Sequence, residues 1–372
     1  MKKIFACALL ALSLCANAHS IDKVQKNVAV GIILDASSFT TGSSKDFIVS
    51  DSAKKQLKLT KGIATVACSS KGVRIGAYDL VLPVTIKPSN GIIFANSKPY
   101  AGYLKLIKSY QKISIINVLT VEDYVKGVLP KEMVSTWVIE ALKTQAVISR
   151  TYTLSNLCRH KRQGFNMCAT THCQVYGGLR DEVPTTNQAV QETQGEVLTY
   201  DGKFAQTLFH AACGGRTDNP KYLWKWEAPY LKGIKCSYCH KAPHIKWEQE
   251  IDANLISKKL ANNDIGKIKK IKVKGKTSSG AAKELEIIHS KGKTILNAYK
   301  FRLAVDAQKI KSHVFNSIKT NGDKIYFKGK GWGHKVGLCQ WGAKGMAEKG
   351  KTYKKILEYF YPGTKIETVI YK

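Results

Sequence analysis

The first hundred residues of the chain alternate between short apolar runs and polar breaks. Runs at 28–34, 62–67 and 80–86 are rich in β-branched residues, and glycine, asparagine and serine separate them. This pattern is typical of short strands, so we expect a β-rich N-terminal part with little evident chemistry. One more strand is expected over 112–119, after which the chain changes character.

The segment that follows has a helical spacing. We expect a short helix over 121–128, which Pro130 ends, and then a long helix that runs to about Asn156 from a cap at Ser135 or Thr136. Apolar positions in the long helix recur every three or four residues, which predicts one buried face. These positions are Val138, Leu142, Ala146 and Ser149.

Helical and strand-like patterns mix in the rest of the chain. We expect a helix and a hairpin within 250–302, with strands over 271–274 and 285–288, and a last helix over 341–349. The chain is long enough for a large core and two domains. These elements predict an α+β fold, in which a substrate cleft separates a β-rich N-terminal part from a mixed helical core.

The N-terminus has the features of a secretory signal peptide. Lys2 and Lys3 precede an apolar run over 4–14, and an Ala-Asn-Ala cleavage site ends at Ala18. The mature chain would then begin at His19. Later segments never reach 18 consecutive apolar residues. We therefore expect an exported protein, in the periplasm or the cell-wall space, without a membrane span.

The chain is strongly basic, with a formal net charge of +32 at pH 7. Such a charge favours polyanionic partners, among them nucleic acid, anionic lipid and cell-wall polymer. Export argues against nucleic acid, and the sequence has no signature of a nucleic-acid-binding module. The plainer alternative is a generally lysine-rich composition, because the lysines are spread along the whole chain.

Two histidines and two cysteines lie within 14 residues: His160, Cys168, His172 and Cys173. These residue types can close a tetrahedral site for zinc, and four protein ligands leave no open position for a catalytic water. Cys158 could replace His160 as a ligand. A disulfide from Cys158 to Cys168 or Cys173 is the alternative, since export permits it. The histidines favour the metal, which we expect to be structural.

A second group of cysteines contains Cys213, Cys236 and Cys239, the last two spaced as a Cys-x-x-Cys knuckle. A histidine could complete a second tetrahedral set, and the nearby candidates are His210, His240 and His244. A structural disulfide from Cys213 is equally compatible with the pattern. A Cys213–His210 hydrolase is a rival idea that lacks a third group.

Ordered motifs from about residue 112 to the end resemble the SpoIID/LytB family. They are VEDYVKGVLPKEM (121–133), ALKTQAVISRTY (141–152), QVYGG (174–178), LFHAACGGRT (208–217), PYL (229–231), GWGH (331–334), GLCQWGA (337–343) and YFYPGT (359–364). The chain departs from the family pattern at Lys335, where a glycine usually follows the histidine, and at Cys339, where serine is common. Eight motifs in the family's order make the resemblance specific.

The resemblance implies a lytic transglycosylase that cuts the β-1,4 bond between N-acetylmuramic acid and N-acetylglucosamine in peptidoglycan, with preference for glycan without stem peptides. The position that matches the family's catalytic acid is Glu132. Breaking a glycosidic bond needs a positioned carboxylic acid, and one suffices when the muramic acid's own 6-hydroxyl attacks and leaves a 1,6-anhydro ring. Glu132 must then be largely protonated, hence partly desolvated. Glu122, Asp123 and Glu140 are the alternative acids.

The family also contains amidase enhancers, so the alternative function is a non-catalytic protein that binds glycan or an N-acetylmuramoyl-L-alanine amidase. The motifs do not separate the two functions, and they do not distinguish roles in cell division, sporulation or wall turnover.

Two residues of the motifs keep two interpretations each. Arg150 is compatible with a structural ion pair or a substrate contact, and Trp332 with sugar stacking or a place in the core.

The resemblance places substrate contacts within the motifs and divides the chain. The expected contacts are Arg150, Tyr152, Gln174, Tyr176, His210, Trp332, His334 and Gln340. The expected divisions are a signal peptide (1–18), the β-rich part (19–111), a SpoIID-type catalytic core (112–245), a lysine-rich α/β insertion (246–305) and a C-terminal segment that completes the core (306–372).

Overall fold

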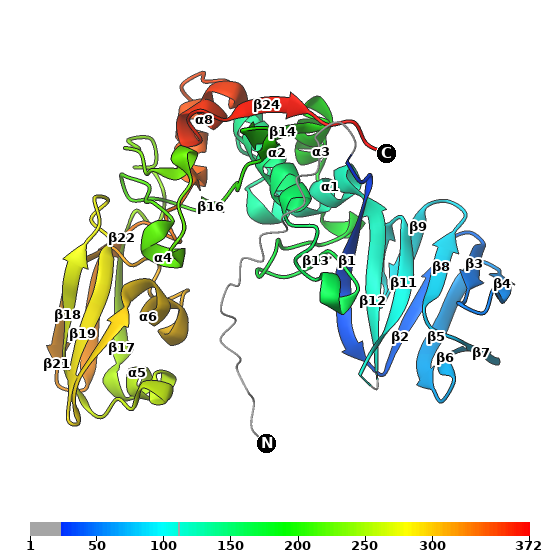
Figure 1. The fold of residues 1–372 in the computed structure, drawn as a ribbon, viewed down its shortest axis with the longest axis horizontal. Coiled ribbons are helices and arrows are strands. Elements are labelled where there is room, and N and C mark those ends of the chain that lie inside the picture. The colour runs from blue at the N-terminus through cyan, green and yellow to red at the C-terminus, as the bar shows by residue number, and fades with distance from the viewer. Residues whose placement is uncertain (1–23, 111) are drawn as a thin grey trace. The chain divides into compact units, whose positions relative to one another are not determined.

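The computed structural model describes residues 24–110 and 112–372 and confirms the mixed α+β class (Figure 1). The chain forms two compact units. The first comprises the described residues up to Gln206 together with Lys365–Lys372, and the second comprises Thr207–Thr364. The predicted signal peptide and His19 lie outside the described residues.

Short strands fill the N-terminal part of the first unit, as the alternating pattern predicts. They are β1 (Asn27–Ala36), β2 (Ser38–Ser43), β3 (Phe47–Ser50), β4 (Gln56–Leu59), β5 (Gly62–Ser69), β6 (Gly72–Ile75), β7 (Tyr78–Leu80), β8 (Val84–Pro88), β9 (Ile92–Ala95), β10 (Lys98–Ala101), β11 (Tyr103–Ser109), β12 (Lys112–Thr120) and β13 (Met167–Cys168). One sheet has the order β13-β1-β12-β11-β8-β3-β4, and a second has the order β10-β9-β2-β5-β6-β7. Both are visible in blue and cyan in Figure 1.

Helix α1 (Val121–Glu132) begins directly after β12 and leads to the candidate catalytic acid. Thr120 caps it, because its hydroxyl accepts a hydrogen bond from the Asp123 N–H (3.1 Å). The predicted end before Pro130 is wrong, since the helix continues to Glu132. Pro130 lies in the last turn and removes only one N–H donor there, and the Met133 N–H still bonds to the Leu129 carbonyl (3.0 Å).

Helix α2 (Ile139–Ser155) is buried on nearly all sides rather than on one face. It packs against α1, α3 (Pro184–Glu192) and β14 (Glu196–Tyr200). The predicted cap at Ser135 or Thr136 is wrong, because Val138 occupies the cap position without a side-chain bond. The structure uses Ser135 differently, since its carbonyl accepts the Thr185 hydroxyl (2.8 Å). Packing, not capping, therefore stabilises α2.

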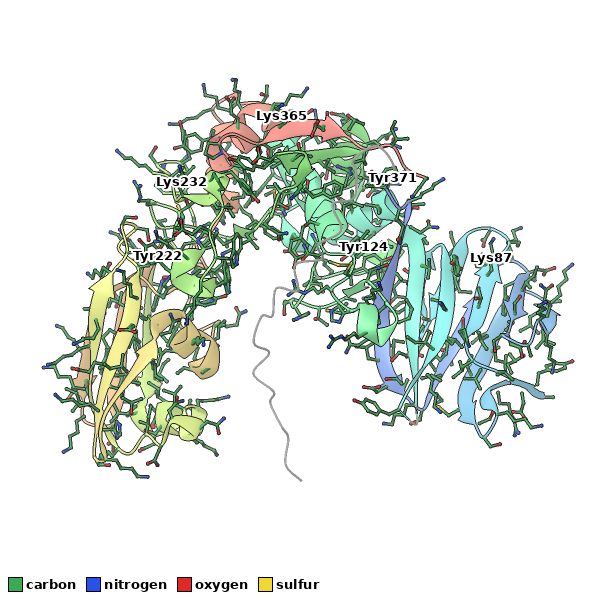
Figure 2. All side chains as sticks on the ribbon, viewed as in Figure 1. Lys87, Tyr124, Tyr222, Lys232, Lys365 and Tyr371 are labelled. Atoms are coloured by element: carbon green, nitrogen blue, oxygen red, sulfur yellow. The ribbon has the colours of Figure 1, made fainter. Side chains whose placement is uncertain are left out.

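A small sheet closes the first unit and brings in the C-terminal residues of the chain. Its order is β15-β14-β24, with β15 at Lys203–Phe204 and β24 at Lys365–Thr368. The last strand is followed by Tyr371, which Figure 2 labels near the end of the chain. Its hydroxyl donates to Glu122 in α1 (2.7 Å). The C-terminal segment of the chain is thus tied to α1.

The second unit combines two three-stranded sheets, a two-stranded parallel pair and short helices. Its elements are β16 (Phe209–His210), α4 (Lys221–Trp224), β17 (Lys246–Asp252), α5 (Ala253–Lys259), β18 (Ile268–Lys276), β19 (Ala282–His289), β20 (Gly292–Asn297), α6 (Ala298–Val305), β21 (Phe315–Asn321), β22 (Lys324–Lys330), β23 (Leu338–Cys339), α7 (Gln340–Ala347) and α8 (Tyr353–Phe360). The sheets have the orders β17-β22-β21 and β18-β19-β20, and β16 pairs with β23. The predicted hairpin, β18 and β19, is confirmed, and α7 confirms the helix predicted over 341–349, although α8 follows it.

An apolar core fills the space between the two three-stranded sheets and helices α5 and α6. Phe301, Phe327 and Ile325 are among its most buried side chains. Most of the residues in this core come from the lysine-rich segment, 246–305. The lysines of that segment are exposed on the surface of the second unit. Among the helices of the described residues, none is both long and apolar enough to span a membrane.

Candidate active site and metal centres

Glu132, the last residue of α1, is half-buried, and one hydrogen bond fixes its carboxyl group from outside the helix. The backbone N–H of Val175 donates to its Oε1 (3.2 Å). Burial raises the pKa of Glu132 above its usual range, whereas the Val175 hydrogen bond lowers it. Burial has the larger effect, so the carboxyl retains its proton to a higher pH than an exposed glutamate. This is the state that a general acid needs.

The alternative acids have other partners. Glu122 forms an ion pair with Arg150 (2.7 Å), Asp123 pairs with Lys126 (3.1 Å), and Glu140 pairs with Lys143. The first two stand in the first turn of α1, where the helix dipole favours carboxylates.

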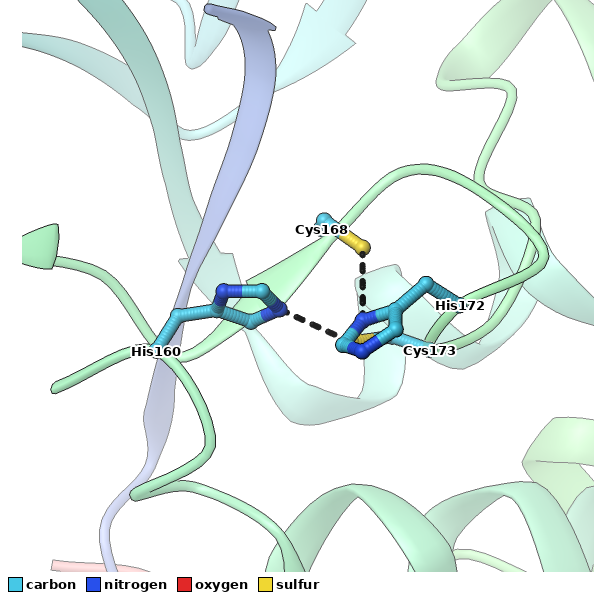
Figure 3. Close-up of side chains that lie close together, drawn as sticks. All are labelled: His160, Cys168, His172 and Cys173. Carbon is cyan, nitrogen blue, oxygen red and sulfur yellow. Dashed lines mark hydrogen bonds between the residues drawn. The ribbon is translucent and has the colours of Figure 1, made fainter. Parts of the chain in front are cut away.

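The Val175 N–H is held in place by the loop that precedes it. His160, Cys168, His172 and Cys173 converge in this loop, and their ligand atoms all lie within 4.8 Å of one another (Figure 3). Cys173 stands two residues before Val175. Whatever fixes this cluster therefore also fixes the donor to Glu132.

The cluster has the dimensions of a tetrahedral zinc site. Zinc bonds of about 2.3 Å to sulfur and about 2.0 Å to nitrogen place neighbouring S and N ligands about 3.5 Å apart. The Cys173 Sγ lies 3.3 Å from His160 Nε2 and 3.6 Å from His172 Nδ1, and the Cys168 Sγ lies 3.7 Å from His172 Nδ1. Cys158 is not among these residues, and the eight described cysteines are all free. The chain thus presents a ligand set that could hold a metal ion.

The sheet positions the cluster. Strand β13 pairs in parallel with β1, which sets Cys168 opposite Gly31. The Phe165 ring stacks on the His160 ring with centroids 4.7 Å apart. A hydrogen bond from the Cys173 thiol lowers the pKa of Cys168 to about 3, so one thiolate is already favoured without a metal.

Tyr152 interacts electrostatically with both Glu132 and the two cysteines of the cluster. Its ring is buried, and its hydroxyl accepts a hydrogen bond from Arg159 (3.2 Å). Burial raises the pKa of Tyr152 to about 12; Arg159 lowers it, and the charges of the two cysteines and Glu132 raise it. Tyr152 is therefore a neutral hydroxyl beside both features.

Three other residues of the predicted contact set are buried and make hydrogen bonds within the protein. Arg150 is fully buried and donates two hydrogen bonds to Glu122. Of the two alternatives for Arg150, the structure shows the ion pair. Gln174 accepts the Thr153 hydroxyl (3.0 Å), and the Tyr176 hydroxyl donates to Asn117 (2.9 Å). The contacts of Gln174 and Tyr176 hold the QVYGG segment against α2 and β12.

The other predicted contact residues come together in the second unit. The rings of His210 and His334 have centroids 5.5 Å apart, and Trp224 lies 5.3 Å from His334 on the other side. The Trp332 ring contacts the His244 ring (4.9 Å), and the Lys311 ammonium lies 4.5 Å from its centroid. Gln340 is buried at the start of α7. The structure thus gives His210, Trp332 and His334 aromatic neighbours in the second unit.

The second cysteine group also converges, but its fourth member differs from the expectation. Cys339 joins Cys213, Cys236 and Cys239, with the four Sγ atoms within 4.8 Å of one another. None of the three candidate histidines belongs to this cluster. In the sequence, Cys339 stood out only as a departure from the family pattern. Spacing alone does not connect it to cysteines that lie about a hundred positions earlier.

Among the described residues, no hydrogen bond joins Cys213 to His210, the two residues of the alternative hydrolase. Within the described residues, His210 Nε2 has no hydrogen-bond partner and His210 Nδ1 contacts the Val336 carbonyl (3.2 Å). The Cys213 thiol instead contacts the Cys239 thiol (3.6 Å).

Two families and several relatives match the chain. Residues 109–200 match the family of stage II sporulation protein, SpoIID, and residues 237–337 match a domain of unknown function. The stage II sporulation protein D of Bacillus subtilis is 32% identical over 263 residues, which cover 67% of this chain and 74% of that protein. An uncharacterized protein of Brachyspira hyodysenteriae is 37% identical over 274 residues, 73% of either chain. The amidase enhancer of Bacillus subtilis is 29% identical over 289 residues, 64% of this chain and 39% of that protein.

Proposed function

Because this chain belongs to the SpoIID/LytB family, we propose that it is an exported lytic transglycosylase that acts on the glycan strands of peptidoglycan. The observation that supports this best is the carboxyl group of Glu132. It is desolvated enough to raise its pKa and is oriented by the Val175 N–H. A single acid of this kind meets the needs of the reaction.

Glu132 acts twice in the proposed reaction. It first gives its proton to the glycosidic oxygen that joins N-acetylmuramic acid to N-acetylglucosamine, and the bond from that oxygen to the muramic C1 breaks. The muramic 6-hydroxyl oxygen then bonds to C1, and its proton passes to Glu132. The products are a 1,6-anhydro-muramic end and a free 4-hydroxyl, and no water is consumed.

Mass spectrometry of glycan digested by the purified protein tests this function. We expect fragments that end in 1,6-anhydro-muramic acid, with the highest yield from glycan stripped of stem peptides. Reducing ends would instead indicate a hydrolase. Stimulation of an N-acetylmuramoyl-L-alanine amidase by a protein that releases no fragments would establish the second candidate, an amidase enhancer, which the similarity to the Bacillus subtilis enhancer favours.

We further propose that His160, Cys168, His172 and Cys173 hold a structural zinc ion. When bound, the ion would supply a closed tetrahedral cross-link. The ion would affect cleavage indirectly, by fixing the loop that contains both Cys173 and Val175. The Val175 N–H in turn orients the Glu132 carboxyl.

We expect about one zinc per chain at this cluster, and a chelator should lower the melting temperature because metal binding contributes to folding free energy. Elemental analysis of the His172→Ala protein should show one zinc fewer than wild type. The control is Cys158→Ser, which changes a neighbouring thiol outside the cluster and should retain the full zinc content. Metal-free protein with a mapped disulfide through Cys168 or Cys173 would refute this assignment.

The lysines of β18 test the role of charge. Lys272, Lys274 and Lys276 are exposed, as the alternation predicts, but Lys272 pairs with Glu286 and Lys274 with Glu284 across the sheet. These acids offset part of the positive charge. We expect the triple change to glutamine to reduce pelleting with insoluble sacculi a few-fold, and added salt should do the same, since the Debye length is about 8 Å at physiological ionic strength.

Cleavage of short soluble glycans should stay near the wild-type rate in that variant. The matched control removes three exposed lysines from the first unit, Lys45, Lys61 and Lys71. Equal loss of pelleting in both variants would mean that only total charge matters. Loss of short-glycan cleavage would place the β18 lysines in the substrate site.

A further inference from the structure

Four buried thiols meet in the second unit, and none of them belongs to the helix or loop that carries Glu132 or Val175. Cys213, Cys236, Cys239 and Cys339 expose at most 2% of their surfaces. They come from three segments of the chain, and Cys213 and Cys339 are 126 residues apart. Free thiols have no need to gather in this way, because each one packs as well among apolar side chains.

We propose that these four cysteines bind a second structural zinc ion. Zinc–sulfur bonds of about 2.3 Å place the sulfurs of a tetrahedral site about 3.8 Å apart. The Sγ atoms of Cys213 and Cys239 are 3.6 Å apart, and all four lie within 4.8 Å of one another. Cys236 and Cys239 have the two-residue spacing of a zinc knuckle. Four soft thiolates in a tetrahedron select zinc over harder cations.

The surrounding backbone is shaped for the sulfurs. The Cys213 N–H donates to the Cys339 Sγ (3.2 Å), a contact that stabilises a thiolate ligand. A Cβ on Gly342 would lie 2.8 Å from the Cys236 Sγ, so only glycine leaves room for the sulfur at this point of α7. The Cys236 N–H bonds to the Gly215 carbonyl (2.9 Å), which fixes the knuckle against the turn after Cys213.

Four thiolates and one zinc carry a net charge of −2, and a buried lysine, Lys335, interacts electrostatically with Cys213 and Cys239. Lys335 is fully buried, and its ammonium donates to the Ser279 hydroxyl (2.9 Å). That hydroxyl in turn donates to Asp218 (2.8 Å). Lys335 and Cys339 are the two positions at which the chain departs from the family pattern. The zinc site accounts for Cys339, which supplies the fourth ligand, whereas Asp218 is the main charge that stabilises the Lys335 ammonium.

The site would act as a cross-link for a region with little regular structure. Strands β16 and β23 are two residues long each, and Cys339 pairs directly with His210. The Trp332 N–H bonds to the Ala212 carbonyl, next to Cys213 (2.7 Å). The ion would thus fix the backbone on which His210 and Trp332 stand, in a fold that short strands stabilise poorly.

Metal content tests the proposal independently of glycan cleavage. The full exported chain, purified without chelator, should contain two zinc ions. Cys339→Ser should contain one, Cys168→Ser should contain one, and the double variant should contain none. Cys68→Ser is the control, because Cys68 is a half-buried thiol outside both clusters, and it should retain two. One zinc in wild type that persists in Cys339→Ser would overturn the proposal.

Alkylation of the wild-type chain keeps the test valid if the variants do not fold. Mass spectrometry should find the four thiols protected from a maleimide in the native protein, and chelator should expose all four together. Replacement of zinc by cobalt should give the absorption of a four-thiolate site, distinct from that of a two-thiolate, two-imidazole site. A disulfide mapped between any two of the four cysteines, or iron in place of zinc, would overturn the assignment.

Discussion

Glu132→Gln should lower the release of 1,6-anhydro-muramic fragments about 10²–10⁴-fold, the usual contribution of a general acid. The amide has nearly the shape of the acid, but it has no proton to give to the glycosidic oxygen. Its side-chain oxygen still accepts the Val175 N–H, so the loop should stay in place. The measurement is the rate of fragment release from purified glycan, followed by mass spectrometry, with the circular dichroism spectrum as the check on folding.

The matched control is Glu140→Gln, which changes a glutamate at the start of the next helix whose partner is Lys143. It should retain nearly the wild-type rate. If Glu132→Gln retained more than a tenth of the activity, Glu132 would not be the acid. If both variants were inactive, the loss would be structural.

The rate of glycan cleavage should fall as the pH rises through the pKa of Glu132. Its pKa is raised in the folded protein, so the active, protonated form is present below that pKa and is lost as the pH rises through it. The same shift opposes folding at every pH above the unfolded-state pKa, because folding must then either bury the hydrated carboxylate or protonate it. Glu132→Gln should therefore unfold at the same or a slightly higher temperature than wild type at pH 7.

Arg150→Met should lower the free energy of unfolding by about 3–5 kcal/mol, the cost of removing one partner from a buried ion pair. The guanidinium is fully buried and donates twice to Glu122 (2.8 and 2.7 Å). It also donates to the carbonyls of Glu196 (3.1 Å) and Val190 (3.2 Å). Methionine fills a similar volume, but it leaves the Glu122 carboxylate and both carbonyls without these donors. Urea unfolding followed by fluorescence gives the free energy.

An exposed arginine with the same geometry provides the control. Arg74 binds Asp79 through two parallel hydrogen bonds (3.0 and 3.1 Å), but 59% of its side chain is exposed. Arg74→Met should lower the free energy of unfolding far less than Arg150→Met, since water replaces the lost contact. Equal losses in the two variants would show that burial does not set the strength of the Arg150 pair. If Arg150→Met kept its stability but lost glycan binding, Arg150 would be a substrate contact.

Some of the site was predictable because its signals are local. The hairpin around residue 279 and the first histidine–cysteine cluster each depend on residues that are close in the sequence, whereas the candidate acid Glu132 came from the family resemblance. His160, Cys168, His172 and Cys173 lie on one loop, so the chain brings them together with little help from the rest of the fold. The alternating pattern before residue 110 likewise predicted strands, because side chains on a strand point to opposite faces in turn.

Helix α2 and the second cysteine cluster show where that reasoning ends. A repeat of three and four residues predicts one buried face, but α1, α3 and β14 surround α2 and bury nearly all of it. Spacing indicated a histidine as the fourth member of the second cluster, and the pairing of β16 with β23 brought Cys339 there instead. The donor to Glu132 is a backbone N–H, which any residue type at position 175 except proline would supply.

The sequence by itself determined the family, the α+β class, the candidate acid and the ligands that neighbour one another along the chain. The tertiary structure decided which distant groups share a site: Arg150 with Glu122, Val175 with Glu132, and Cys339 with Cys213. The reason is physical. Residue type and local spacing report propensity and periodicity, whereas long-range contacts follow from how sheets pair and helices pack, and one sequence pattern is compatible with many such arrangements.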